Sequence, residues 1–114
     1  MNNVMIIAEV GVNHNGSLDR AIKMIDEAAL AGVDVVKFQT FKSTNLVTKD
    51  AVLADYQAKN VGKSISQQSM LSSLELSQRD FVALKHHCSL RSVEFLSTAF
   101  DDESIQMLGD MHPK

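Results

Sequence analysis

The chain has 114 residues, of which 45% are hydrophobic and 22% charged, and its formal net charge is −3 with the histidines neutral. These values are typical of one globular domain, and they argue against a disordered or fibrous protein. The mild acidic excess gives no electrostatic reason to expect nucleic acid or a membrane surface as a partner.

The first third of the chain predicts a β-α-β unit. Residues 4–11 form a nearly continuous apolar run that ends in glycine, as is typical of a strand covered on both faces. Ser17 is placed to cap a helix whose apolar residues recur every three or four positions until Gly32 ends it. Residues 33–39 are rich in β-branched side chains and predict a second strand, which the crossover rule makes parallel to the first.

The pattern weakens in the middle of the chain and returns in its last third. Residues 40–69 form a polar stretch without a sustained period, for which we expect a long functional loop with a short helix near residues 50–59. The sequence Ser77-Gln78-Arg79-Asp80 resembles a capping box and predicts the start of a helix. Residues 93–97 predict a third strand, and three acids at 101–103 predict the first turn of a last helix.

The sequence also indicates a compartment. The longest apolar runs fall far short of the ~20 residues that a membrane span needs, and residues 1–3 lack the basic start of a signal peptide. The single cysteine, Cys88, excludes an intramolecular disulfide and any cysteine-based zinc site. We therefore expect a cytoplasmic protein in a reducing environment.

Each predicted strand carries polar residues toward its end. They are Glu9 in the first strand, Lys37 and Gln39 in the second, and Ser97 and Thr98 in the third. A (β/α)8 barrel and an open doubly wound sheet both fit the order of elements, and both place their sites at the carboxyl ends of the strands. Lys37 is flanked by apolar residues, so burial of its charge requires an anion. That anion is either Glu9, in a purely structural ion pair, or a phosphate or carboxylate of a ligand. The remaining alternative is that the Lys37 side chain extends to solvent at an edge of the sheet.

Two polar motifs leave alternatives open. His14 is interpreted as a metal ligand, a proton donor or, from its position before a helix, a hydrogen-bonding residue at the helix start. Ser97 and Thr98 precede an acidic helix start, where they either hold a phosphate or only end the strand and cap the helix. The chain contains neither GxGxxG nor GxxxxGK followed by Ser or Thr, which argues against dinucleotide and P-loop nucleotide binding.

Together these motifs strongly resemble the sialic acid synthase family. The resemblance extends over four segments in the family's order: residues 8–16, residues 35–40, Tyr56-Gln57 with Asn60, and residues 94–101. It implies an α/β fold that is the N-terminal part of a TIM barrel, with residues 1–114 as about three β/α units in one partial domain. The remaining barrel strands and the family's C-terminal antifreeze-like domain are absent from this sequence, so we expect a fragment of the enzyme.

The resemblance also implies an activity and its residues. Family members condense phosphoenolpyruvate with N-acetylmannosamine, or a related amino sugar, to a nine-carbon sialic acid and phosphate. By resemblance, Glu9 and Lys37 are catalytic: Glu9 lies by the sugar, and Lys37 holds phosphoenolpyruvate together with Thr98. The further substrate-binding residues are Gln39, Asn60 and Ser97. A divalent metal, manganese or magnesium, is held by histidines from later strands outside this chain, and the full-length protein is expected to be a homodimer.

Two other functions remain compatible with the sequence. One is an inactive remnant that keeps the fold pattern and binds an anion, and the other is a small flavodoxin-like binding module. The module explains the order of strands and helices but not the matching residues at the strand ends. The motifs do not identify the sugar, because sialic, legionaminic and related acid synthases share them.

Overall fold

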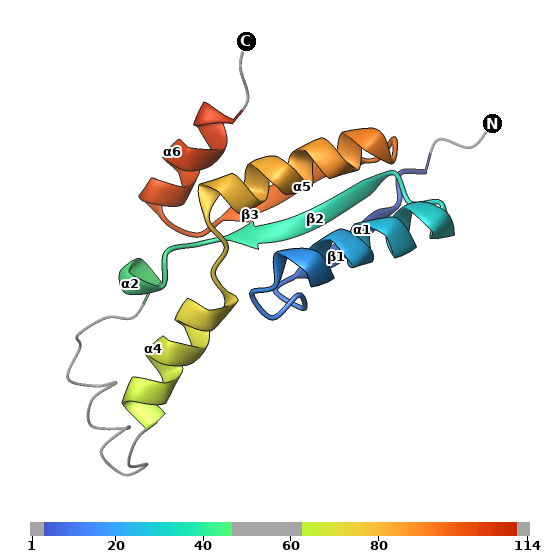
Figure 1. The fold of residues 1–114 in the computed structure, drawn as a ribbon. Helices are drawn as coiled ribbons and strands as arrows, with labels where there is room; N and C mark the ends of the chain where they lie inside the picture. Colours follow the sequence, from blue (N-terminus) through green and yellow to red (C-terminus); the bar gives the residue numbers. More distant parts are fainter. Residues whose placement is uncertain (1–3, 47–62, 112–114) are drawn as a thin grey trace.

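The computed structural model describes residues 4–46 and 63–111, which form one parallel three-stranded sheet with helices packed around it (Figure 1). The elements follow in the order β1 (Ile7–Gly11), α1 (Leu18–Ala31), β2 (Val35–Thr40), α2 (Ser43–Leu46), α4 (Lys63–Leu74), α5 (Gln78–Leu90), β3 (Glu94–Ala99) and α6 (Asp102–Asp110). Strand β2 lies between β1 and β3. The predicted strands are confirmed, whereas the helix expected near residues 50–59 and the residue Asn60 lie outside the described residues.

Local signals in the sequence account for the helix ends. The Ser17 hydroxyl accepts a hydrogen bond from the N–H of Arg20 at the start of α1, and Gly32 ends that helix with φ of 91°. At the start of α5, the Ser77 hydroxyl accepts from the N–H of Asp80, and the Asp80 carboxylate accepts from the N–H of Ser77. Such a cap typically contributes about 1 kcal/mol, because it satisfies N–H groups that the helix leaves unpaired. Both predicted helix starts are confirmed.

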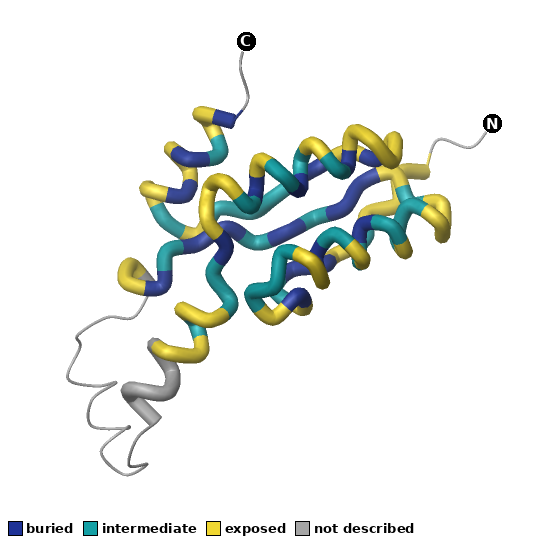
Figure 2. Tube along the Cα trace, in the orientation of Figure 1, coloured by how far each residue is buried: buried dark blue, intermediate teal, exposed yellow. Residues whose placement is uncertain are grey.

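The core lies between the sheet and two helices. Helices α1 and α5 lie side by side over one face of the sheet (Figure 1). Figure 2 shows buried positions along most of β2 and at intervals along both helices. Phe38 and Phe95 stack across β2 and β3 with ring centroids 5.7 Å apart, and Phe81 of α5 meets Phe95 edge-on at 6.3 Å. Ile25 of α1 and Leu84 of α5 are completely buried in the same cluster, so this face of the sheet is a closed apolar layer.

The first strand is less covered than its apolar sequence predicts. β1 begins at Ile7 rather than at residue 4, and the side chains from Val4 to Ile7 are exposed. In the described sheet β1 is an edge strand that pairs with β2 alone. The expectation of a strand covered on both faces is therefore wrong for this structure. The apolar run is nevertheless what a strand inside a larger parallel sheet requires.

Two helices lie within the stretch where we predicted a long loop. α2 follows β2 closely, and α4 precedes α5. The sequence of α4, KSISQQSMLSSL, has no sustained apolar stripe, so an amphipathic period does not reveal it. The expectation of one long loop over residues 40–69 is therefore wrong at both ends of that stretch. Neither these helices nor any other in the described residues is long and apolar enough to cross a membrane.

A charged cluster joins α1 to α5 on the outer side of the helix layer. Asp26 Oδ1 of α1 lies 2.6 Å from His87 Nε2 and 2.7 Å from Arg91 Nε at the end of α5. The hydrogen bond with His87 is the main cause that lowers the pKa of the Asp26 carboxyl, and Arg91 lowers it further. These charge-assisted contacts hold the two helices against each other above the sheet.

Candidate functional site

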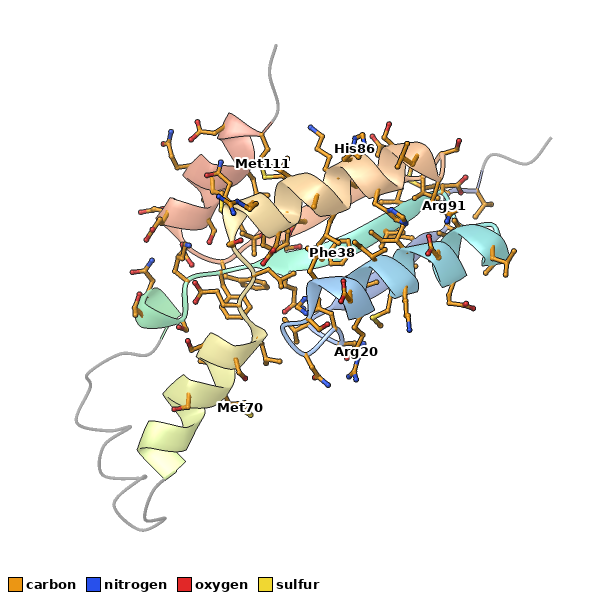
Figure 3. All side chains as sticks on the ribbon, viewed as in Figure 1. Arg20, Phe38, Met70, His86, Arg91 and Met111 are labelled. Atoms are coloured by element: carbon orange, nitrogen blue, oxygen red, sulfur yellow. The ribbon has the colours of Figure 1, made fainter. Side chains whose placement is uncertain are left out.

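Polar side chains from three adjacent strands share one face of the sheet. Residues aligned across parallel strands point to the same face. Glu9 of β1 is aligned with Lys37 of β2. Two positions further along β2, Gln39 is aligned with Thr98 of β3. Phe38, between them, lies on the opposite side of β2, which α1 and α5 cover (Figure 3). We call that side the covered face, and the side that carries Glu9, Lys37, Gln39 and Thr98 the open face.

A partner of Lys37 expected from the sequence is present. Lys37 Nζ lies 3.4 Å from Glu9 Oε1, and the two side chains are 35% and 48% exposed, respectively. The expectation of a buried cation is wrong, because the side chains of both Lys37 and Glu9 reach solvent. An ion pair this exposed contributes only about 0 to 1 kcal/mol to stability. The pair therefore contributes little to stability. Because the Lys37 side chain is partly exposed, its charge is accessible to an anionic ligand.

Gly11 allows the Glu9 carboxylate and the Gln39 amide to lie close to the same point. The alignment of β1 with β2 is irregular between Glu9 and Gly11, and Gly11 adopts φ of 60°. A Cβ on Gly11 would lie 3.0 Å from Glu9 Oε2 and 3.3 Å from Gln39 Nε2. Both groups therefore converge on the space beside this glycine. Gly11 was not among the predicted site residues, although a glycine at the end of an apolar run is the signal that points to it.

The two hydroxyl residues of β3 lie on different faces. Thr98 is aligned with Gln39 on the open face. Ser97 is aligned with Phe38 on the covered face, and its Oγ lies 2.6 Å from Thr40 Oγ1 in a hydrogen bond that joins β3 to β2. The structure thus brings Thr98 to the open face but not Ser97. A substrate contact by Ser97 stays a prediction, and its observed contact is with the neighbouring strand.

The helix start after β3 is occupied by a carboxylate of this chain. Asp101 Oδ1 accepts a hydrogen bond from the N–H of Ser104, and Asp101 Oδ2 accepts one from the N–H of Lys42, both at 2.8 Å. Burial raises the pKa of Asp101, but these hydrogen bonds outweigh burial and hold that pKa below its usual value. The negative charge of Asp101 disfavours a phosphate at this helix end. The expected helix cap is therefore present, and Asp101 makes it rather than Ser97 or Thr98.

His14 is buried beside the turn that follows β1. It is 0% exposed, its ring centroid lies 6.3 Å from that of Phe38, and its Nδ1 accepts a 2.9 Å hydrogen bond from the N–H of Gly16. Burial lowers the pKa of His14, and the nearby backbone of Gly11 opposes this only in part. Because Nδ1 is an acceptor, the neutral ring carries its proton on Nε2. Of the three interpretations of His14, hydrogen bonding at the helix start is confirmed.

The divalent metal implied by the resemblance has no site in the described residues. Within residues 4–46 and 63–111, no three His, Cys, Asp or Glu side chains gather closely enough to hold a metal ion. On the open face, Glu94 lies at the start of β3, so Glu9 is the carboxylate nearer the carboxyl ends of the strands, and the ammonium group of Lys37 beside it repels a cation. These residues therefore do not fit a metal, and no chemical step is assigned to one here.

Comparisons with known proteins identify relatives of this chain. The profile of the NeuB family matches residues 24–114. The N,N'-diacetyllegionaminic acid synthase of Legionella pneumophila is 47% identical over 103 residues, which are 90% of this chain and 29% of that protein. The synthase of the same name from Campylobacter jejuni is 43% identical over 111 residues, which are 97% of this chain and 33% of that protein.

A solved structure has a similar fold. The crystal structure of the N-acetylneuraminic acid (sialic acid) synthetase from Leptospira borgpetersenii, in complex with citrate, matches with a TM-score of 0.75 and 31% identity. The match covers 96% of this chain and 34% of that chain. This chain thus spans about a third of the length of these relatives. Its three parallel strands and their helices form the predicted part of a TIM barrel. The family profile and these similarities show that the chain belongs to the NeuB family.

Proposed function

We propose that this chain supplies the substrate-binding strands of a synthase that condenses phosphoenolpyruvate with an amino sugar of the N-acetylmannosamine class. The observation that carries the proposal is the open face. Glu9, Lys37, Gln39 and Thr98 come from three consecutive parallel strands and lie toward their carboxyl ends on one side of the sheet. In a TIM barrel, this end of the strands is where the active site forms.

Lys37 and Thr98 suit phosphoenolpyruvate. This substrate carries a carboxylate and a phosphate, and the ammonium group of Lys37 is 35% exposed on the open face. A lysine binds such an anion as a point charge, and a threonine hydroxyl on the adjacent strand supplies a neutral donor. Glu9 does not bind this substrate, because its carboxylate repels both anionic groups of phosphoenolpyruvate.

Glu9 and Gln39 suit the amino sugar. A carboxylate accepts hydrogen bonds from sugar hydroxyls, and an amide both donates and accepts them. The two groups converge beside Gly11, next to the charge that holds the other substrate. In the reaction, the methylene carbon of phosphoenolpyruvate bonds to the aldehyde carbon of the sugar. Water adds at the carbon that loses phosphate. By holding both substrates in line, these strands lower the activation free energy of the condensation.

The experiment uses the complete synthase, by which we mean this chain joined to the remainder of the barrel, supplied where needed by the L. pneumophila relative. Product is measured with phosphoenolpyruvate and either N-acetylmannosamine or its diacetylated analogue. Lys37→Ala should lower kcat/KM for phosphoenolpyruvate by roughly 30- to 160-fold, the kinetic equivalent of about 2 to 3 kcal/mol for a charge-assisted contact. The matched control is Arg79→Ala on α5, since Arg79 is an exposed cation on a helix that covers the opposite face of the sheet.

Each other outcome rejects a defined part of the proposal. Unchanged kinetics in Lys37→Ala would show that Lys37 serves only as the structural partner of Glu9. Tight binding of phosphoenolpyruvate without product, in an otherwise folded complete synthase, would favour an anion-binding protein over an enzyme. An equal loss in Arg79→Ala would trace the effect to charge in general rather than to the open face.

A further inference from the structure

We propose that Gly11 is a positioning residue for the amino sugar, because its missing side chain leaves the space that the Glu9 carboxylate and the Gln39 amide approach. This inference rests on the proposed function and assigns a role to a residue outside the predicted site. The space lies beside the sugar-binding pair and not beside Thr98, which is on the far strand of the sheet. A side chain at position 11 should therefore weaken the use of the amino sugar while leaving phosphoenolpyruvate little affected.

The three glycines with positive φ have different surroundings, and only one of them borders the open face. Gly32, with φ of 91°, has nothing within 4 Å of the position of a Cβ. A Cβ on Gly16 would lie 1.8 Å from the backbone oxygen of Ser73, so that glycine allows a close approach of backbone to backbone. The three atoms nearest to a Cβ on Gly11 are side-chain atoms of Glu9 and Gln39.

A methyl group added at Gly11 should shift the polar ends of Glu9 and Gln39 without disrupting the fold. At 3.0 Å and 3.3 Å, a methyl group is closer than ordinary contact to Glu9 Oε2 and Gln39 Nε2. Both atoms end flexible side chains, so they move by a few tenths of an ångström while the backbone stays in place. Since a small misplacement of positioning groups costs much in rate, the displacement should be visible in the kinetics of the sugar.

The test compares Gly11→Ala with Gly32→Ala in the complete synthase. Both substitutions place an alanine at positive φ, but only the first adds a contact, so the second measures the conformational cost alone. Gly11→Ala should raise KM for the amino sugar by about 10-fold or more and change KM for phosphoenolpyruvate less than about twofold. Gly32→Ala should lower the melting temperature and leave both KM values unchanged.

A second pair of variants and a double variant keep the inference testable if alanine is poorly tolerated. Asparagine adopts positive φ more readily than alanine, as Asn15 does in this chain with φ of 55°. Gly11→Asn should therefore fold and show the same selective rise in KM for the sugar, with Gly32→Asn as its control. In a Gln39→Ala background, Gly11→Ala should raise KM for the sugar less than it does alone, because one of its two contacts is gone.

The outcomes separate this inference from the proposed function. A complete synthase that folds but makes no product rejects the proposed function and, with it, the role of Gly11. An active synthase in which Gly11→Ala weakens both substrates equally, or in which Gly32→Ala has the same kinetic effect, rejects the role of Gly11 alone. Failure of both Gly11 variants to fold, with both Gly32 variants folded, would show that Gly11 serves folding and would overturn the inference.

Discussion

Toward its carboxyl end, strand β2 has an apolar, buried face and a polar, partly exposed face. On the covered face, Val36, Phe38 and Thr40 are completely buried. On the open face, Lys37 and Gln39 alternate with them and are only partly buried. Because successive side chains of a strand point to opposite faces, one strand can contribute to the core and to a binding site at the same time. In β2, the residues that stabilise the core are therefore different from the residues that are available to bind a ligand.

The two faces also differ in how their groups are held. Side chains of the covered face interlock with rings and aliphatic groups from α1 and α5, so many contacts position each of them. The groups of the open face come from three strands, and the alignment of those strands determines which of them lie together. Substitutions on the covered face should therefore change the free energy of unfolding, and substitutions on the open face should change kinetics.

The largest effect is expected from the covered face. Phe38→Ala should lower the free energy of unfolding by about 3 to 5 kcal/mol, because it removes a completely buried ring that stacks on Phe95 and leaves a cavity. Denaturant unfolding of the complete synthase measures the loss. The matched control is Phe100→Ala, whose ring is 50% exposed and whose loss should stay below about 1 kcal/mol. Equal losses in the two variants would break the distinction between the faces.

A smaller effect on stability, with a clear effect on turnover, is expected from Glu9→Gln. The amide keeps the shape of Glu9 but removes the charge, so turnover should fall while KM for phosphoenolpyruvate stays nearly constant. The melting temperature should change little, because an ion pair between such exposed side chains contributes at most about 1 kcal/mol. Glu27→Gln, at an exposed position of α1, is the matched control.

The same measurement tests the structural alternative for Glu9. If Glu9 serves only to neutralise Lys37, its loss should destabilise the protein, and phosphoenolpyruvate should restore stability as a replacement anion. Melting temperatures of Glu9→Gln with and without phosphoenolpyruvate decide between the two roles. A large loss of stability that the ligand reverses, with normal turnover at saturation, would reject a catalytic role for Glu9.

The smallest effect is expected from His14, which is buried in the turn that follows β1. Burial holds the pKa of His14 below its usual 6.5, so below that pH the unfolded chain takes up a proton that the folded ring does not. Stability linked to His14 is therefore present above about pH 6.5 and is lost as the pH falls toward the folded-state pKa.

Replacement of His14 should make the pH dependence of stability shallower. His14→Gln should melt at a lower temperature than the wild type at about pH 7, and it should lose less of its remaining stability between about pH 7 and pH 5. His86→Gln is the matched control, because His86 is an exposed histidine of α5. A wild-type pH dependence in His14→Gln would show that the ring is not kept neutral by burial.

The regular elements were predictable because their signals are local. Ser17 and Ser77 cap helices through hydrogen bonds to N–H groups three residues away, so the interaction is encoded within one turn. Gly32 ends α1 because glycine adopts a positive φ without a steric cost. Helix α4 was not predicted because it lacks such a local signal: its serines and glutamines form no periodic apolar pattern.

The candidate site was predictable in its residues but not in its geometry. Glu9, Lys37, Gln39 and Thr98 were identified from their places near strand ends and from the resemblance, and the alignment of the strands puts them on one face. Ser97 follows the same local rule but points to the other face, where it bonds to Thr40. Nothing in the sequence around Ser97 and Thr98 states which of the two faces each will take, because that depends on pairing with a distant strand.

The amino-acid sequence by itself determined the parallel β/α order, the helix caps and the residue types at the strand ends, because periodicity, capping and crossover handedness act over short distances. Only the tertiary structure decided that Lys37 is partly exposed beside Glu9, that Asp101 occupies the start of α6, and that Gly11 makes room for two polar groups. These features depend on contacts between segments that are far apart in the chain. Their geometry follows from how the strands align and how the helices pack, which no local pattern records.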